Sequence, residues 1–166
     1  MTQREMERTV QPSVLDRLTD MDPRSGVDTR TSYAESLRAF KGAVQRDLEW
    51  LLNTRRTAEP APEGYDEVCR SLYHYGLPDI TSVGRESAQD RSRLLKGVED
   101  AIALFEPRLS NVTVRLVEME GEQQRRELRF LVDATLLMDP TPEQVVFDTV
   151  LHFASGEYVV AGGRDA

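Results

Sequence analysis

Glu106-Pro107-Arg108-Leu109 is the stretch that decides the fold, because the spacing of the apolar residues changes across it. Before this stretch, apolar residues recur every three or four positions, which is typical of one face of a helix: Leu95, Val98, Ile102 and Phe105. After it they alternate, which is typical of a strand: Val112, Val114 and Leu116. Pro107 disfavours helical conformation at the residue before it and donates no backbone hydrogen bond. The stretch therefore predicts a joint between a helix and a β-sheet.

Two opposite charges, Glu106 and Arg108, flank the proline of this joint. In one interpretation Arg108 lies near the last carbonyl groups of the helix and offsets the negative end of its dipole, a contribution on the order of 0.3–1 kcal/mol. In the other, Glu106 and Arg108 brace the helix to another segment or bind a partner. We expect the pair to be partly exposed, so that Arg108→Ala leaves the domain folded, because such a pair contributes about 0–1 kcal/mol. Both interpretations fit the spacing.

Helical patterns dominate the first two-thirds of the chain. A short helix is predicted over 11–18, and its apolar side should dock on the domain because so short a helix is unstable alone. Ser32 and Glu35 form the pattern of a capping box, which opens a long amphipathic helix that ends near Asn53.

Arg55 and Arg56 directly follow this long helix. They either offset the helix dipole from a solvated position or form a surface that attracts anions and carboxylates. A third helix is expected over 65–75, with Cys69 as a small buried apolar side chain. A fourth begins between Ser87 and Asp90 and leads into the joint.

The last third of the chain has the alternation of strands. We place about four of them, at 111–120, 126–138, 145–153 and 158–160. Short turns between them predict an antiparallel meander. Because the helices precede the strands, the fold class is α+β, with the helices packed on one face of the sheet.

The chain reads as one structural unit with two short ends. Residues 1–10 are polar and unpatterned, so we predict a disordered N-terminus there. A single domain is expected over 11–160. Residues 161–166 are predicted to be a C-terminal tail.

The composition excludes some kinds of partner. The chain has 166 residues, 39% of them apolar, and a formal net charge of −8. Acidic balance argues against binding to nucleic acid or to anionic membranes, since both need clustered Lys and Arg. The apolar runs are too short to span a membrane, and the N-terminus lacks the apolar core of a signal peptide. With a single cysteine as well, the sequence predicts a cytoplasmic protein.

The sequence contains no recognisable catalytic or metal-binding motif. His74 and His152 each lack neighbouring ligands at metal-site spacing. A glycosidase needs two carboxyl groups across a cleft, one of them kept protonated. Glu106 would be the best candidate, but Arg108 two residues away favours its ionised form. We therefore predict no catalytic residue, no metal and no cofactor.

Four motifs occur in the order typical of the TssE family, the baseplate subunits of the bacterial type VI secretion system. This family is similar to a small wedge protein of contractile phage baseplates. The resemblance covers about 12–160 and rests on four stretches: Pro12-Ser13-Val14-Leu15-Asp16-Arg17-Leu18, Leu48-Glu49-Trp50-Leu51-Leu52-Asn53-Thr54-Arg55-Arg56, Tyr75-Gly76-Leu77-Pro78-Asp79 and Glu106-Pro107-Arg108-Leu109.

The resemblance implies a structural protein of a cytoplasmic baseplate assembled at the inner membrane. It implies the wedge subunits TssF, TssG and TssK and the sheath proteins TssB and TssC as partners, with a monomer outside the assembly. In the family, the Glu-Pro-Arg motif is linked to sheath assembly, and here it falls on Glu106, Pro107 and Arg108. We add Arg55 and Arg56 as expected partner-binding residues.

Two other functions remain open. The chain could be an adaptor or chaperone for one cytoplasmic partner, and some members of the family have been labelled lysozyme-like. For the baseplate function, we expect the first ring of the sheath to pair with a free edge of the sheet. Glu106 and Arg108 would then fix the orientation of that edge relative to the helices.

Overall fold

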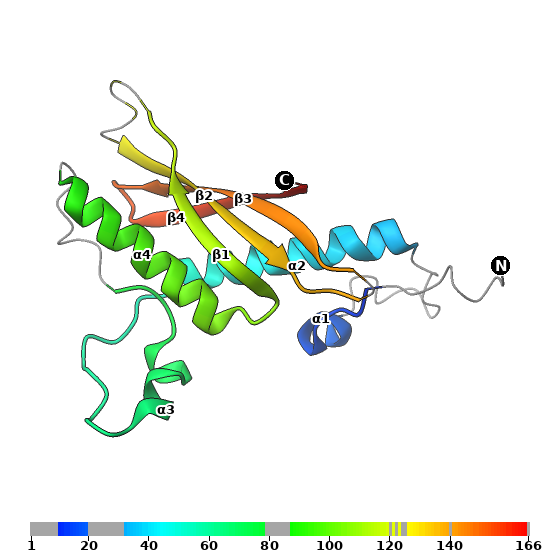
Figure 1. Cartoon of the computed structure of the whole chain (residues 1–166), viewed down its shortest axis with the longest axis horizontal. Helices are drawn as coiled ribbons and strands as arrows, with labels where there is room; N and C mark the ends of the chain where they lie inside the picture. Colours follow the sequence, from blue (N-terminus) through cyan, green and yellow to red (C-terminus); the bar gives the residue numbers. More distant parts are fainter. Residues whose placement is uncertain are drawn as a thin grey trace.

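The computed structural model describes residues 10–19, 32–78, 87–119, 121, 123, 126–139 and 141–165. Residues 1–9 of the N-terminus predicted to be disordered lie outside these residues. Along the chain the elements are α1 (Val14–Leu18), α2 (Tyr33–Asn53), α3 (Asp66–Cys69), the 3-10 helix η1 (Leu72–His74), α4 (Ala88–Phe105), β1 (Leu109–Leu116), β2 (Glu127–Leu136), β3 (Glu143–His152) and β4 (Glu157–Asp165). Figure 1 shows their arrangement.

The strands form one four-stranded antiparallel sheet in the order β1-β2-β3-β4. Each strand therefore pairs with its neighbour in sequence, which confirms the predicted meander and the α+β fold class. Val132 in β2, for example, lies opposite Val114 on one side and Phe147 on the other. The edges of the sheet are β1 and β4 (Figure 1).

The core lies between one face of the sheet and the helices α2 and α4. Alternate residues of β2 are buried, as predicted: Leu128, Phe130, Val132, Ala134 and Leu136. From the helices, Val44, Leu48, Val98 and Ile102 complete the same cluster. Burying an aliphatic or aromatic side chain of this size contributes about 1.5–3 kcal/mol, so this layer accounts for most of the stability.

The two long helices begin as the sequence predicts. Ser32 and Glu35 form the complete capping box of α2, each side chain bonding to the backbone of the other residue. The hydroxyl of Ser87 accepts a hydrogen bond from the backbone of Asp90 and begins α4. No helix in the described part of the chain is long and apolar enough to cross a membrane.

The helix predicted over 65–75 is wrong. The segment forms two short pieces, α3 and η1, and Leu72, the first residue of η1, is 83% exposed. Ser71 explains the break, because its hydroxyl donates to the carbonyl of Val68 and accepts from the N–H of Tyr73, which competes with helical bonding. Cys69, expected to be buried, is exposed. Figure 1 shows α3 projecting from the body of the domain.

The N-terminal predictions also need correction. The apolar side of α1 does not dock, since Val14 and Leu18 are 72% and 79% exposed. An ion pair holds this helix instead, as described below. Val10, placed in the predicted disordered end, is buried in the core, and its N–H donates to the hydroxyl of Ser36 at 3.2 Å.

Two strands differ in extent from the prediction. β1 begins at Leu109, and its register with β2 shifts between Ser110 and Thr113, where Asn111 has a φ of 52°. A bulge of this kind increases the local twist of a strand. Leu116, the last residue of β1, is 39% exposed. β4 continues to Asp165, so most of the predicted tail belongs to the sheet. Its register also shifts, close to two glycines with positive φ that give no strand signal in the sequence.

Candidate assembly site at the joint between α4 and β1

Backbone hydrogen bonds fix the joint on both sides. The N–H of Glu106 donates to the carbonyl of Ile102 at 2.9 Å, which closes the last turn of α4. The N–H of Leu109 donates to the carbonyl of Glu106 at 3.0 Å, so the chain turns directly into β1. The carbonyl of Arg108 accepts from Leu137 at 2.8 Å, just past the end of β2. Pro107 is exposed at the outer corner of this turn.

The carboxylate of Glu106 points inward and is held by Arg108. The residue is only 5% exposed. The Nε of Arg108 lies 2.6 Å from one carboxylate oxygen and its Nη2 2.5 Å from the other. The pairing is therefore bidentate, the strongest geometry for an arginine and a carboxylate.

The same guanidinium also reaches helix α2. Nη2 of Arg108 lies 2.7 Å from Oδ2 of Asp47, which is 61 positions away in the sequence. Its central carbon lies 5.9 Å from the centre of the Phe40 ring, within the range of a cation–π contact. These contacts support the bracing interpretation of Arg108, because its donors bind carboxylates on two elements.

From Asp47 the charges continue outward to α1. The Nη2 of Arg46 lies 2.8 Å from Oδ1 of Asp47, and its Nη1 lies 2.7 Å from Oδ1 of Asp16. Signs alternate throughout, so each inner charge has an opposite charge on both sides. We call these five side chains the ion-pair chain: Glu106, Arg108, Asp47, Arg46 and Asp16.

Hydrogen bonds within the ion-pair chain stabilise its charged forms. The hydroxyl of Ser13 and the guanidinium of Arg46 lower the pKa of Asp16. Asp16 and Asp47 in turn raise the pKa of Arg46. The pKa of Arg108 is raised, chiefly by its hydrogen bonds to Glu106. Asp16, Arg46 and Arg108 are thus fully ionised at neutral pH.

The burial of this pair corrects an expectation from the sequence. The side chains of Glu106 and Arg108 are 6% and 20% exposed, so the pair is not the partly exposed one that was expected. Removing Arg108 would leave a buried carboxylate without its bidentate partner. Breaking a buried pair in this way typically costs about 3–5 kcal/mol.

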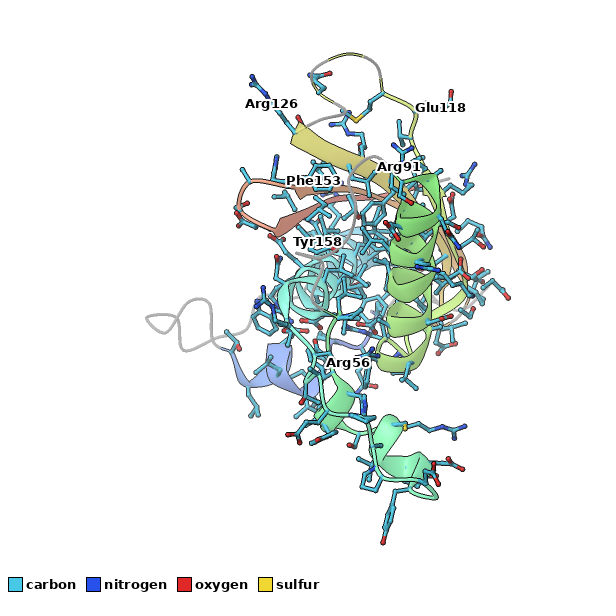
Figure 2. The ribbon with its side chains drawn as sticks, turned by 90° about the vertical axis from the view of Figure 1, so that its left-hand side faces the viewer. Arg56, Arg91, Glu118, Arg126, Phe153 and Tyr158 are labelled. Atoms are coloured by element: carbon cyan, nitrogen blue, oxygen red, sulfur yellow. The ribbon has the colours of Figure 1, made fainter. Side chains whose placement is uncertain are left out.

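Arg55 and Arg56 lie elsewhere, at the root of the projecting segment that carries α3; Figure 2 labels Arg56 there. Both are exposed, and their backbone forms a short parallel bridge with Leu77. The N–H of Arg56 donates to the carbonyl of Leu77 at 2.8 Å. Gly76 is required here: its φ is +101°, and a Cβ would lie 2.2 Å from the carbonyl oxygen of Thr54.

One aromatic contact connects this root to the joint. The ring of Tyr75 packs edge-on against Phe105, with their centres 5.3 Å apart. Burial raises the pKa of Tyr75, and the nearby charges of Asp47 and Glu106 raise it further. The root that carries Arg56 is therefore packed next to the ion-pair chain.

Sequence reasoning identified Glu106 and Arg108, the two residues of the buried pair. It missed Asp47, Arg46 and Asp16. A signal existed for two of them, because Arg46 and Asp47 are adjacent opposite charges in a helix, beside the buried Leu48. Asp16 falls in a quoted motif but was given no role. Nothing in the sequence pairs residue 47 with residue 108.

The chemistry of the site is that of a structural clamp. Arg108 occupies both oxygens of Glu106, so this carboxyl group has no free oxygen from which to donate a proton. No group of three or more His, Cys, Asp or Glu within the described ranges could hold a metal ion. The arrangement can fix α1, α2 and the start of β1 relative to one another.

Comparison with known proteins agrees with this structural role. The family model described as baseplate wedge protein gp25 matches residues 38–141, which is more than half of the chain. The match includes the joint, Arg46 and Asp47, whereas α1, β3 and β4 fall outside it. No curated protein sequence matches the chain.

Proposed function

We infer the function from one premise: this chain belongs to the family of the baseplate wedge protein gp25. It is therefore a structural baseplate component, and the family match leaves open which contractile machine it serves. We propose the type VI secretion system, because the four TssE-like motifs include Pro12-Ser13-Val14-Leu15-Asp16-Arg17-Leu18, outside the matched range.

In this proposal the chain joins the wedge subunits TssF, TssG and TssK in a cytoplasmic baseplate at the inner membrane. It also serves as the platform on which the sheath proteins TssB and TssC begin to assemble. Glu106, Pro107 and Arg108 carry this role, with Arg55 and Arg56 at the neighbouring root. We propose no catalytic activity and no cofactor.

One observation carries the assignment of this role to the joint: the buried bidentate pair of Glu106 and Arg108. Arg108 links Glu106, at the end of α4, to Asp47 in α2, at 2.6 and 2.7 Å. A platform must present the sheet in one fixed orientation, since a small misplacement prevents a large partner from engaging all of its contacts. The ion-pair chain supplies such rigidity at the point where the first strand begins.

The test is a charge-free replacement of this pair. In Glu106→Gln with Arg108→Met, no buried charge is left unpaired, so the domain should fold with a melting temperature near that of wild type. Sheath assembly in cells should nevertheless fall, because the link to Asp47 is lost. Circular dichroism melts and counts of fluorescent sheaths measure the two effects.

A second ion pair provides the matched control. Lys41 in α2 and Glu143 in β3 form a partly buried pair at 2.8 Å, also between a helix and the sheet. Lys41→Met with Glu143→Gln should leave both stability and sheath number unchanged. Normal sheath numbers in the joint variant would contradict the proposal, and so would equal losses in both variants.

The adaptor hypothesis predicts a different set of partners. A baseplate subunit should co-purify with several baseplate proteins in fixed ratio, whereas an adaptor should bring down one. The glycosidase hypothesis is disfavoured by the occupied oxygens of Glu106. The family match favours the baseplate role over both.

A further inference from the structure

A cavity separates the projecting segment, residues 57–75, from the outer face of α4. Its volume is about 540 Å³, and pockets that bind ligands typically measure about 300–1,000 Å³. One wall comes from α4 and the other from the chain on both sides of α3. Figure 1 shows this segment beside α4, and Figure 2 labels Arg56 at its root. The cavity is therefore large enough to hold more than one side chain of another protein.

The α4 wall of the cavity is apolar and hollowed in the middle. Gly97, Ala101, Leu104 and Phe105 line it, at spacings of three and four residues that place them on one helical face. A Cβ at Gly97 would meet no atom of the described residues within 4 Å. Leu104 is 44% exposed. A large apolar side chain could therefore lie over Gly97 and Ala101 and cover Leu104.

The charges that line the cavity are not balanced. Arg56 is the only arginine or lysine among the described residues that line it. The two lining carboxylates already have partners: Glu59 accepts from the hydroxyl of Tyr73 at 3.3 Å, and Asp100 lies 3.0 Å from Nζ of Lys96. The exposed guanidinium of Arg56 has no such partner in the described part of the chain. A carboxylate is the group that complements it, since arginine binds carboxylates strongly.

The cavity is continuous with the joint between α4 and β1. Phe105, which lines the cavity, directly precedes Glu106, and its ring packs against Tyr75 with the centres 5.3 Å apart. A protein bound at the joint could therefore extend along α4 into the cavity.

We propose that this cavity binds a segment of another wedge subunit in which a carboxylate side chain lies next to a large apolar side chain. The carboxylate pairs with Arg56, and the apolar side chain fills the hollow over Gly97 and Ala101 beside Leu104. The inference rests on the proposed function, which supplies the wedge subunits as partners. It adds the place on this chain where one of them docks and the chemistry of its docking segment.

Two variants close the cavity in different ways. Arg56→Glu reverses the unpaired charge. Gly97→Met fills the hollow, and because methionine is a better helix former than glycine, α4 should not lose stability. Each variant should weaken binding of the purified chain to a purified complex of TssF, TssG and TssK at least about tenfold, as expected for the loss of a central arginine or apolar contact.

Each of these variants has a matched control elsewhere on the chain. Arg70→Glu reverses another exposed charge of the projecting segment, at a residue that does not line the cavity. Gly42→Met changes a glycine of α2 that likewise has no atom of the described residues within 4 Å of its Cβ position. Both controls should bind as tightly as wild type. Circular dichroism melts verify that all four variants are folded.

The binding results separate the two hypotheses. If the wild-type chain does not bind the wedge complex, the proposed function fails, and this inference fails with it. If wild type binds and either cavity variant binds as tightly, only the cavity inference is wrong. Equal losses in the cavity variants and in their controls would also contradict it.

The single cysteine provides a test on the unaltered chain. Cys69 is exposed and lines the cavity. Wedge complex at about ten times its Kd leaves about one chain in ten unbound, so alkylation of Cys69 by iodoacetamide should slow about tenfold. Mass spectrometry of the peptide that contains Cys69 follows the reaction. An unchanged rate in the presence of bound wedge complex would overturn the inference.

Arg56→Lys identifies the group that the cavity binds. Lysine keeps the positive charge, and a carbodiimide joins its amine to a carboxylate in direct contact. In the complex, Arg56→Lys should become cross-linked to an Asp or Glu of a wedge subunit, whereas Arg70→Lys should not. The absence of this cross-link, or cross-links to acidic residues of the same chain alone, would overturn the assignment of a carboxylate.

Discussion

Two arginines of this domain make the same bidentate contact in different surroundings. Arg108 binds both oxygens of Glu106 at the joint, and Arg115 binds both oxygens of Asp133 on the sheet, with its Nε at 2.8 Å and its Nη2 at 2.7 Å. Distances do not distinguish the pairs. The side chain of Arg115 is 62% exposed, however, and that of Arg108 only 20%.

The comparison teaches that geometry alone does not set the role of an ion pair. Water can replace either partner of the exposed pair between β1 and β2, so that pair adds little to stability. Water cannot easily reach Glu106, which therefore depends on Arg108. Arg108 also has a second anionic partner on another element, Asp47. Only the buried pair can transmit a change at the joint to α2.

The largest effect should come from a new charge in the core beside the buried pair. Ile102 is fully buried, and its carbonyl accepts the N–H of Glu106. Ile102→Asp should unfold the domain, because an unpaired buried charge costs several kcal/mol against a total stability of about 5–15 kcal/mol. Leu48→Asp in α2 should do the same.

Ala103 offers the control for this prediction, because it is exposed one position further along α4. Ala103→Asp should melt cooperatively near the wild-type temperature. Cooperative, near-wild-type melts of both Ile102→Asp and Leu48→Asp would show that the buried helix faces are assigned incorrectly.

The intermediate effect comes from truncating the two arginines themselves. Arg108→Ala should lower the free energy of unfolding by about 3–5 kcal/mol, since it leaves the buried carboxylate of Glu106 without its partner. Arg115→Ala should lower it far less, because water can replace the guanidinium at this exposed pair. Urea unfolding followed by circular dichroism gives both values. Equal losses would mean that burial does not separate the pairs.

Much of this fold could be predicted from local patterns. The capping box at Ser32, the helix that leads to Glu106 and the alternation around Phe130 each involve residues close together in sequence, and each was confirmed. The errors have two different origins, one tertiary and one local. The apolar side of α1 satisfies the helical pattern yet stays exposed, and a hydroxyl at Ser71 interrupts a segment that otherwise reads as one helix.

The candidate site was harder to predict from the sequence than the fold. Glu106 and Arg108 stand out because they flank a proline where the apolar period changes. Their burial and the bond to Asp47 depend on how α2 crosses the joint, which no spacing encodes. The hydrogen bond from the N–H of Val114 to Glu99 could not be predicted for the same reason, since these two residues meet only when α4 lies beside β1.

The smallest effect is expected at the α1 end of the ion-pair chain, where Asp16 holds this short helix through Arg46. The hydrogen bond from Ser13 lowers the pKa of Asp16, and the charges of Arg46 and Arg108 assist. A carboxyl group whose pKa is lower in the folded state stabilises the fold above its unfolded value of 3.8. This contribution is lost as the pH falls through the lower folded value.

The loss can be followed at a single reporter. Arg46 lies over the ring of Trp50, the only tryptophan in the chain, with its central carbon 5.1 Å from the ring centre. When Asp16 takes up a proton, it releases one nitrogen of Arg46, and the fluorescence of Trp50 should change below about pH 4. Asp16→Asn should already show the acid-form signal at pH 7, with no step on acidification. A step that persists unchanged in Asp16→Asn would mean that another group produces it, and that α1 is not held by its ion pair.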